Sequence, residues 1–289
     1  MTNFSIGEAW SQAMAFLSAH LRMTLLFVAA GVLIPLILQF AVLGGTMETL
    51  FSPEAMMANP NDPFAVFAGL GAAFFVVIVV SGIIQSASYF ASWRHGLSGG
   101  QEEAAGAIVY GLGAAALWFL AQIVLLIVIV LVIAVPFGLI AGFGAASGGS
   151  PMLIGVFALI LIPLFLVFIL WISARLICVG PAMADARSMN PLFGLSQSWQ
   201  LTRASQWPIV GYLVVLFVAA MVLLTVISLI AGIGAAGAMA AGGEDSTGFM
   251  IITVISGVLL GIPMALGYVA IPAGIYRTLV PNDAGDVFA

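Results

Sequence analysis

Six stretches of this sequence are long enough and apolar enough to cross a lipid bilayer as helices. A spanning helix needs about 20 mostly apolar residues, because each residue rises about 1.5 Å through roughly 30 Å of hydrocarbon. None of the six stretches contains Asp, Glu, Lys or His. The sequence therefore predicts an all-α integral membrane protein that forms a single polytopic domain over residues 1–289. The predicted spans are Leu21–Leu43, Phe67–Ser92, Ala115–Gly138, Met152–Ser173, Ile209–Ile233 and Phe249–Arg277.

The composition excludes a soluble fold. Hydrophobic residues make up 63% of the chain and charged residues only 6%. A soluble domain carries about 25% charged residues, so this chain has too few to cover a surface that faces water. The formal net charge is −5 and the basic residues form no stripe, which argues against nucleic acid as a partner. The expected partners are membrane lipids, with a membrane protein as a further candidate.

The distribution of arginine predicts the orientation in the membrane. All basic residues are arginine, and all lie on the side of the predicted spans that carries both termini. The positive-inside rule therefore predicts that both termini are cytoplasmic. The tryptophans map to the same side, where an apolar ring with one N–H suits the headgroup level. These residues are Arg22, Arg94, Arg175, Arg187, Arg203 and Arg277, with Trp10, Trp93, Trp118, Trp171, Trp199 and Trp207.

The cytoplasmic side also carries amphipathic segments that suggest an internal repeat. Phe4–Leu21 and Pro191–Trp207 place apolar residues at intervals of three to four, as expected for helices lying in the interface. Ala104–Ala116 is a weaker third case. Each is followed by a pair of spans, so we predict three units of elbow helix plus hairpin, with a pseudo-threefold repeat. The units cover residues 4–96, 104–180 and 190–280.

The connections on the far side differ in composition. The first, near Gly44–Phe64, contains three prolines and is expected to form an ordered cap. The second and third, Ala141–Ser150 and Ala231–Gly243, are rich in Gly and Ala, and we expect them to be flexible.

The arginines at the cytoplasmic ends of the spans are the main candidates for a binding site. Each hairpin returns to that side at an aromatic residue followed by arginine, which predicts equivalent depths for Arg94, Arg175 and Arg277. Together they could surround one anionic lipid headgroup, because arginine binds phosphate through two parallel N–H donors. The alternative is that each side chain only reaches to the interface and fixes topology. The candidate headgroup contacts are Arg94, Arg175, Arg203, Arg277, Trp93, Trp171 and Trp199.

The sequence offers no set of residues for catalysis or metal binding. His20 and His95 are far apart along the chain and lack neighbouring cysteines, so we expect neither a metal nor a cofactor. Cys178 is interpreted as a packing residue. Gln85 and Gln122 lie at membrane depth and could form an amide pair. The chain is therefore not expected to be an enzyme.

One stretch resembles a known family. Ala174-Arg-Leu-Ile-Cys-Val-Gly-Pro-Ala182 and Ser198-Trp-Gln-Leu-Thr-Arg203, with Trp207, resemble the six-helix bacterial membrane domain associated with some glycerophosphoryl diester phosphodiesterases. The resemblance implies a six-helix fold and a loose association with lipids in the bacterial cytoplasmic membrane. It does not imply the phosphodiesterase reaction, because the His-Arg-Gly and Glu-x-Asp motifs of the catalytic barrel are absent from this sequence.

Three functions are considered as hypotheses. The first is a non-enzymatic scaffold or accessory subunit that engages lipids or a protein partner at the cytoplasmic face. The second is a transporter or flippase for a lipid or other amphiphile, which a continuous polar cavity between the second, third and fifth spans would favour. An intramembrane enzyme is a third reading, and it lacks a nucleophile or an acid–base pair.

Overall fold

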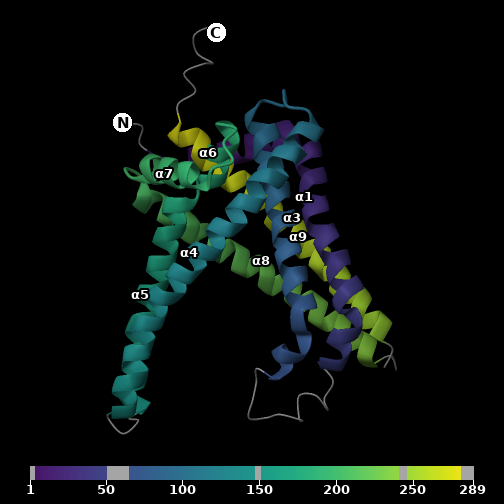
Figure 1. Ribbon diagram of the computed structural model, residues 1–289, viewed down its shortest axis with the longest axis vertical. Helices are drawn as coiled ribbons and strands as arrows, with labels where there is room; N and C mark the ends of the chain where they lie inside the picture. The colour runs from purple at the N-terminus through teal and green to yellow at the C-terminus, as the bar shows by residue number, and fades with distance from the viewer. Residues whose placement is uncertain (1–3, 51–64, 147–150, 241–245, 281–289) are drawn as a thin grey trace.

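The computed structural model describes residues 4–50, 65–146, 151–240 and 246–280, and every regular element in these ranges is a helix (Figure 1). Six helices are long and apolar enough to cross a membrane, over Ile6–Val42, Phe74–Leu97, Ala104–Val132, Leu159–Asp185, Gln206–Leu229 and Val254–Leu279. The predicted all-α membrane class is therefore confirmed. The helices are α1 (Ile6–Leu50), α3 (Ala65–Leu97), α4 (Ala104–Ala146), α5 (Pro151–Leu176), α6 (Val179–Asp185), α7 (Pro191–Thr202), α8 (Gln206–Ala240) and α9 (Ser246–Leu279).

The spans converge at one end of the molecule and diverge at the other. Helix α1 begins and α9 finishes at the end that also carries α6 and α7, called the terminal end below (Figure 1). Helix α1 packs against α3 and α9, and α4 packs against α3. Farther from the terminal end, α4 and α5 diverge from α1, α3 and α9, while α8 crosses to reach α9 (Figure 1).

The buried core lies near the terminal end. Phe16, Phe90, Tyr110 and Met183 are each at most 2% exposed and pack together from α1, α3, α4 and α6. Along the rest of the spans large apolar side chains are exposed, as Leu159 is at 76%. Lipid tails are as apolar as these side chains, so exposing them in a bilayer carries no hydrophobic penalty.

Small residues set the close approach of the spanning helices. A Cβ added at Gly111 of α4 would lie 2.5 Å from the Ala87 carbonyl oxygen of α3. A Cβ at Gly261 of α9 would lie 2.9 Å from a methyl of Val32 in α1. Gly261 ends the sequence Gly257-Val-Leu-Leu-Gly261, so this small-xxx-small pattern serves packing within the chain.

Helix α4 includes the third predicted elbow helix, which was the weakest of the three. It runs without interruption from Ala104, so Ala104–Ala116 is not a separate interfacial helix. The segment holds no proline and is rich in alanine, the best helix former, and it therefore extends the span. Helix α1, in contrast, bends at His20, where φ is −126° and ψ is 20°. The threefold repeat stays a prediction.

The far connections are shorter than predicted. Helix α1 continues to Leu50, α4 to Ala146 and α8 to Ala240. Residues 141–146 and 231–240 are therefore helical and do not belong to the connections, because alanine-rich sequence favours helix even where glycine is frequent. The predicted cap over residues 51–64 lies outside the described residues, as do 147–150 and 241–243.

Helix α7 is the predicted amphipathic segment, but it buries a different face. It begins after Asn190, whose side chain accepts a hydrogen bond from the backbone N–H of Leu192 at 3.0 Å. Its buried stripe consists of Gly194, Ser198 and Thr202, whereas Trp199 is 42% exposed. Small hydroxyl residues face the protein because they hydrogen-bond to the end of α5, as described below.

Replacing Gly111 with alanine tests the close contact between α3 and α4. Because the added methyl meets backbone atoms of α3, Gly111→Ala is expected to destabilise the protein by about 1–3 kcal/mol, as overpacking does. Gly211→Ala in α8 is the matched control, since nothing lies within 4 Å of its added Cβ. Thermal unfolding in detergent should show a lower midpoint for the first variant only. Equal midpoints would mean that the two helices do not approach so closely.

Candidate functional site

Trp93 is a core residue and not a headgroup contact. It is 5% exposed, and its ring packs against α6, where a Cβ at Gly180 would overlap it. Its indole N–H donates to the carbonyl oxygen of Val269 in α9 at 2.8 Å. The prediction that Trp93 faces lipid headgroups is therefore wrong, because the indole finds its partner inside the protein.

Trp118 also departs from the predicted interfacial belt. Since α4 begins at Ala104, Trp118 lies about 20 Å along the helix axis from that end. It lines a pocket between the spans. Trp10, Trp199 and Trp207 are the tryptophans that remain largely exposed, at 49%, 42% and 60%.

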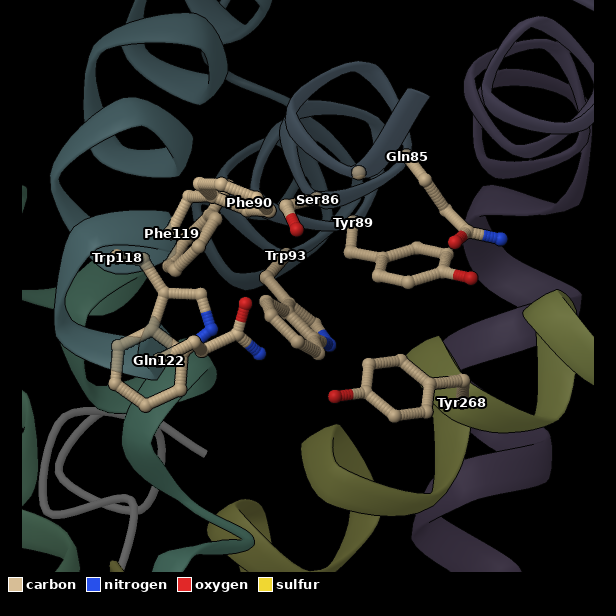
Figure 2. A pocket seen from close by; sticks show the side chains of 10 residues that line it. Gln85, Ser86, Tyr89, Phe90, Trp93, Trp118, Phe119, Gln122 and Tyr268 are labelled. Atoms are coloured by element: carbon tan, nitrogen blue, oxygen red, sulfur yellow. The ribbon is translucent and has the colours of Figure 1, made fainter. Parts of the chain in front are cut away.

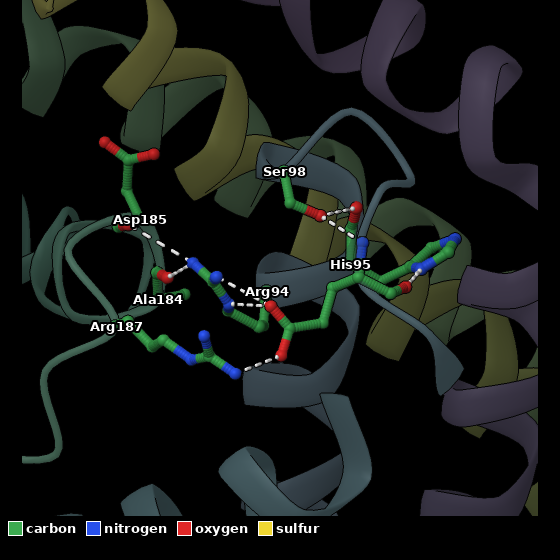
Figure 3. Close-up of polar contacts among 7 residues, drawn as sticks. Arg94, His95, Ser98, Ala184, Asp185 and Arg187 are labelled. Atoms are coloured by element: carbon green, nitrogen blue, oxygen red, sulfur yellow. Dashed lines mark hydrogen bonds and ion pairs between the residues drawn. The ribbon is translucent and has the colours of Figure 1, made fainter. Parts of the chain in front are cut away.

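Arg94 belongs to an ion-pair cluster at the terminal end (Figure 3). Its Nη2 lies 2.6 Å from Oε2 of Glu102, and its Nη1 donates to the carbonyl oxygen of Ala184 at 2.9 Å. The other oxygen of Glu102 accepts from Arg187 at 2.9 Å. One carboxylate thus contacts two guanidiniums, and Arg94 also caps the last turn of α6.

The chain between α3 and α4 explains how Glu102 reaches Arg94. Gly99 and Gly100 have φ of 66° and 79°, the left-handed region that favours glycine, so the backbone turns back on itself. The turn is held by a hydrogen bond from the N–H of Glu102 to Oγ of Ser98 at 3.3 Å, and by His95 Nδ1 against the Glu102 carbonyl oxygen at 2.9 Å (Figure 3). Sequence reasoning missed Glu102; the paired glycines before it are the signal that could have found it.

Arg277 ties α9 to α3. Its Nη2 donates to the carbonyl oxygen of Gly96 at 3.1 Å, and its Cζ lies 5.2 Å from the centroid of the Phe16 ring. The neighbouring Tyr276 donates to Oδ2 of Asp185 at 2.8 Å. These contacts hold the end of α9 against α3 and α6.

Arg175 makes a different set of contacts, at the junction of α5 and α7. It is 2% exposed, and its Cζ lies 4.1 Å from the centroid of the Trp199 ring. Its Nη1 donates to Oγ1 of Thr202 at 3.3 Å, whereas its Nε has no hydrogen-bond partner among the described residues. Its carbonyl oxygen accepts from Oγ of Ser198 at 2.7 Å.

The predicted ring of Arg94, Arg175 and Arg277 gains no support from these contacts. Arg94 and Arg277 serve the packing of α3, α6 and α9, whereas Arg175 faces α7. Each guanidinium has its own protein partners, so a single headgroup shared by the three stays a prediction.

Arg175 and Arg203 form a corner with excess positive charge, called the α5–α7 corner below. Arg203 follows Thr202 directly, is exposed, and its charge opposes that of Arg175. Within the described ranges both ion pairs involve Glu102, and neither reaches this corner. Trp171 completes it: its indole N–H donates to Oε1 of Gln206 at 3.2 Å, and its ring meets Trp199 edge to face at 5.7 Å.

A pocket of about 290 Å³ lies between α3, α4 and α9, called the aromatic pocket below (Figure 2). The polar cavity considered for a transporter was expected against the fifth span, but this pocket lies against the sixth. Gln85 and Gln122 both line it, yet they extend from opposite sides in Figure 2 and form no amide pair in the described structure. The lining residues are Gly82, Gln85, Ser86, Tyr89, Phe90, Trp93, Trp118, Phe119, Gln122 and Tyr268.

The histidines and the cysteine complete the candidates. His20 and His95, which are far apart along the chain, lie edge to face with ring centroids 5.8 Å from each other, because the bend of α1 sits beside the end of α3. No group of three or more potential metal ligands occurs in the ranges that the structure describes. Cys178 is buried and free, as a packing residue would be.

Comparison with known proteins adds no relative. No family model, curated protein or solved structure matches the chain.

Replacing Glu102 tests the ion-pair cluster. Glu102→Gln removes the charge that both Arg94 and Arg187 contact, so we expect a loss of about 1.5–3 kcal/mol in stability, as for hydrogen bonds to charged groups. Glu103→Gln is the control, because Glu103 is exposed and adjacent. Chemical denaturation in detergent measures both. A Glu102 variant as stable as the control would show that the cluster contributes nothing to stability.

Proposed function

We propose that this chain is a non-enzymatic, multi-pass membrane protein that binds anionic lipid headgroups at its terminal end. In this role it serves as a scaffold or accessory subunit for a membrane protein partner. The α5–α7 corner supports the proposal most directly, because the buried Arg175 has no carboxylate beside it among the described residues.

The energetics of a buried guanidinium favour an external anion. Removing a charge from water is costly unless it is paired and hydrogen-bonded. The Arg175 guanidinium donates one long hydrogen bond to Thr202 and lies over the face of Trp199, while the charge of Arg203 repels it. A lipid phosphate at the rim of this corner would neutralise both arginines. Arginine is suited to that task because its planar donors match phosphate geometry.

The surroundings of the corner suit the membrane interface. Trp199 and Trp207 are exposed beside it, and tryptophan favours the headgroup level. Arg94, by contrast, already has Glu102 as counter-ion. The proposal therefore narrows the candidate headgroup contacts from seven residues to Arg175, Arg203, Trp171 and Trp199.

The cytoplasmic location of the terminal end and the bacterial inner membrane are parts of the proposal. The first rests on the arginine distribution and the positive-inside rule. The second rests on the resemblance to the bacterial membrane domain. The predicted threefold repeat finds partial support in the bend at His20 and the separate α7, while the continuous α4 weighs against it.

A second candidate function is a lipid transporter or flippase, which the aromatic pocket favours. A flippase reconstituted in vesicles would speed the loss of fluorescence when dithionite reduces labelled lipid, because inner-leaflet lipid would reach the outside. If the protein is a scaffold, we expect fluorescence to be lost at the same rate as in protein-free vesicles. Rates that rise with protein content would instead favour the transporter.

Charge removal at the α5–α7 corner tests the proposed headgroup site. We expect protein extracted in a lipid-retaining polymer to be enriched in anionic lipid, and Arg203→Gln to reduce that enrichment severalfold. Arg203 is exposed, so its replacement should not disturb folding. Arg175→Gln should act in the same direction, and mass spectrometry of the co-purified lipids measures both.

Arg22→Gln is the matched control, because it removes one exposed arginine at the same end but outside the corner. It should keep the enrichment. If all three variants lose anionic lipid equally, attraction is a matter of net charge alone. If none does, the corner binds no headgroup and the proposal fails.

A further inference from the structure

The aromatic pocket extends from the terminal end into the depth of the membrane. Its α3 wall runs from Trp93, close to the end of the helix, to Gly82. Eleven residues of helix correspond to about 16 Å, roughly half the hydrocarbon thickness. A ligand in this pocket would therefore have its polar part below the headgroup level.

The pocket contains polar groups but no charged ones. Among its lining residues the polar side chains are amides, hydroxyls and indoles, and none is Asp, Glu, Lys, Arg or His. A charged headgroup at this depth would meet no counter-charge, which is costly in a medium of low dielectric. The lining therefore selects against phosphate and ammonium groups.

Two polar side chains of the pocket have no hydrogen-bond partner among the described residues. The indole of Trp93 is satisfied by Val269. No side-chain hydrogen bond within the described ranges involves Gln122 or Tyr268, and Figure 2 shows the Gln122 amide and the Tyr268 hydroxyl directed into the same space beside Trp93. Polar groups in the hydrocarbon region need hydrogen-bond partners, so these two favour a ligand with carbonyl or hydroxyl oxygens.

The pocket is accessible from the bilayer. Tyr268 is 52% exposed and Gln85 is also exposed, although both lie on spanning helices. Exposed surface at this depth faces lipid, so the route of entry is lateral. A volume of about 290 Å³ holds a small polar head, while an apolar tail would stay among the lipid chains.

We infer that the aromatic pocket binds the head of an uncharged amphiphile. Gln122 and Tyr268 hydrogen-bond to its carbonyl or hydroxyl oxygens, and the rings of Trp93 and Trp118 pack against it. Two sources share this chemistry: a glycerolipid without a phosphate, and a lipid with a flat carbonyl-bearing ring. The pocket shares no residue with the α5–α7 corner, so the test of this inference is independent of the test of the proposed headgroup site.

Quenching of tryptophan fluorescence tests this inference, because Trp93 and Trp118 line the pocket. The protein in phosphatidylcholine nanodiscs is titrated with dibrominated diacylglycerol, with decylubiquinone, and with phosphatidylglycerol carrying the same brominated chains. We expect saturable quenching by at least one uncharged probe. The charged probe should quench only weakly, in proportion to its concentration, because it meets the protein only by random contact. Saturation by diacylglycerol or by the quinone identifies which source fits.

Two variants locate the site. Gln122→Leu and Tyr268→Phe each remove one hydrogen-bonding group and should weaken the saturable phase about ten-fold, the equivalent of about 1.4 kcal/mol. Thr225→Val is the control, because the Thr225 hydroxyl bonds the Met221 carbonyl oxygen of its own helix and lies outside the pocket. A thermal unfolding midpoint equal to that of the unsubstituted protein establishes that a variant is folded. If Gln122→Leu does not fold, Tyr268→Phe alone tests the site.

Three results would overturn the inference. The first is quenching that never saturates with either uncharged probe. The second is saturable quenching that survives in both folded pocket variants. The third is saturation by the phosphatidylglycerol probe with the same sensitivity to the variants, since an uncharged lining would then not exclude charge.

Discussion

The absence of water from the bilayer core governs this structure. Every backbone N–H and C=O within the hydrocarbon must find its partner in the protein, and long helices achieve this within a single segment. Association of these helices then has little hydrophobic driving force, because the lipid is as apolar as leucine. The chain accordingly packs closely only where small residues permit it, as at Gly111 against Ala87, and spreads apart where large side chains prevail.

The charged contacts of the described residues therefore lie at the terminal end, where they perform two tasks. Glu102 and Asp185 bind together α3, α6 and α9 through Arg94 and Tyr276. These contacts join α3, α6 and α9 at the terminal end. The α5–α7 corner is left with two arginines and no carboxylate in the described structure. Arg94 thus differs from Arg175 in having a carboxylate within ion-pair distance, and this difference is the basis of the proposed headgroup site.

The sequence predicted the spans well and their contacts poorly, for a physical reason. Hydropathy and length depend on each segment alone, so six spans could be recognised before any packing was known. Trp93 was misplaced because an interfacial tryptophan and a core tryptophan look the same until Val269 is brought beside it. Pairings such as His20 with His95 depend on the bend of α1. The sequence indicated two residues of the aromatic pocket, Gln85 and Gln122, but it did not indicate that α9 forms the third wall.

The two proposed sites lie at different depths in the membrane and favour lipids of different charge. At the α5–α7 corner the dielectric constant rises toward that of the headgroup region, and two unbalanced guanidiniums favour an anion. In the aromatic pocket the same anion would lose its hydration without gaining a counter-charge, while amide and hydroxyl groups can satisfy a neutral head. Converting a charged lipid to an uncharged one would therefore move its preferred position from the corner to the pocket. The two proposed sites would thus distinguish a phospholipid from its dephosphorylated product by charge alone.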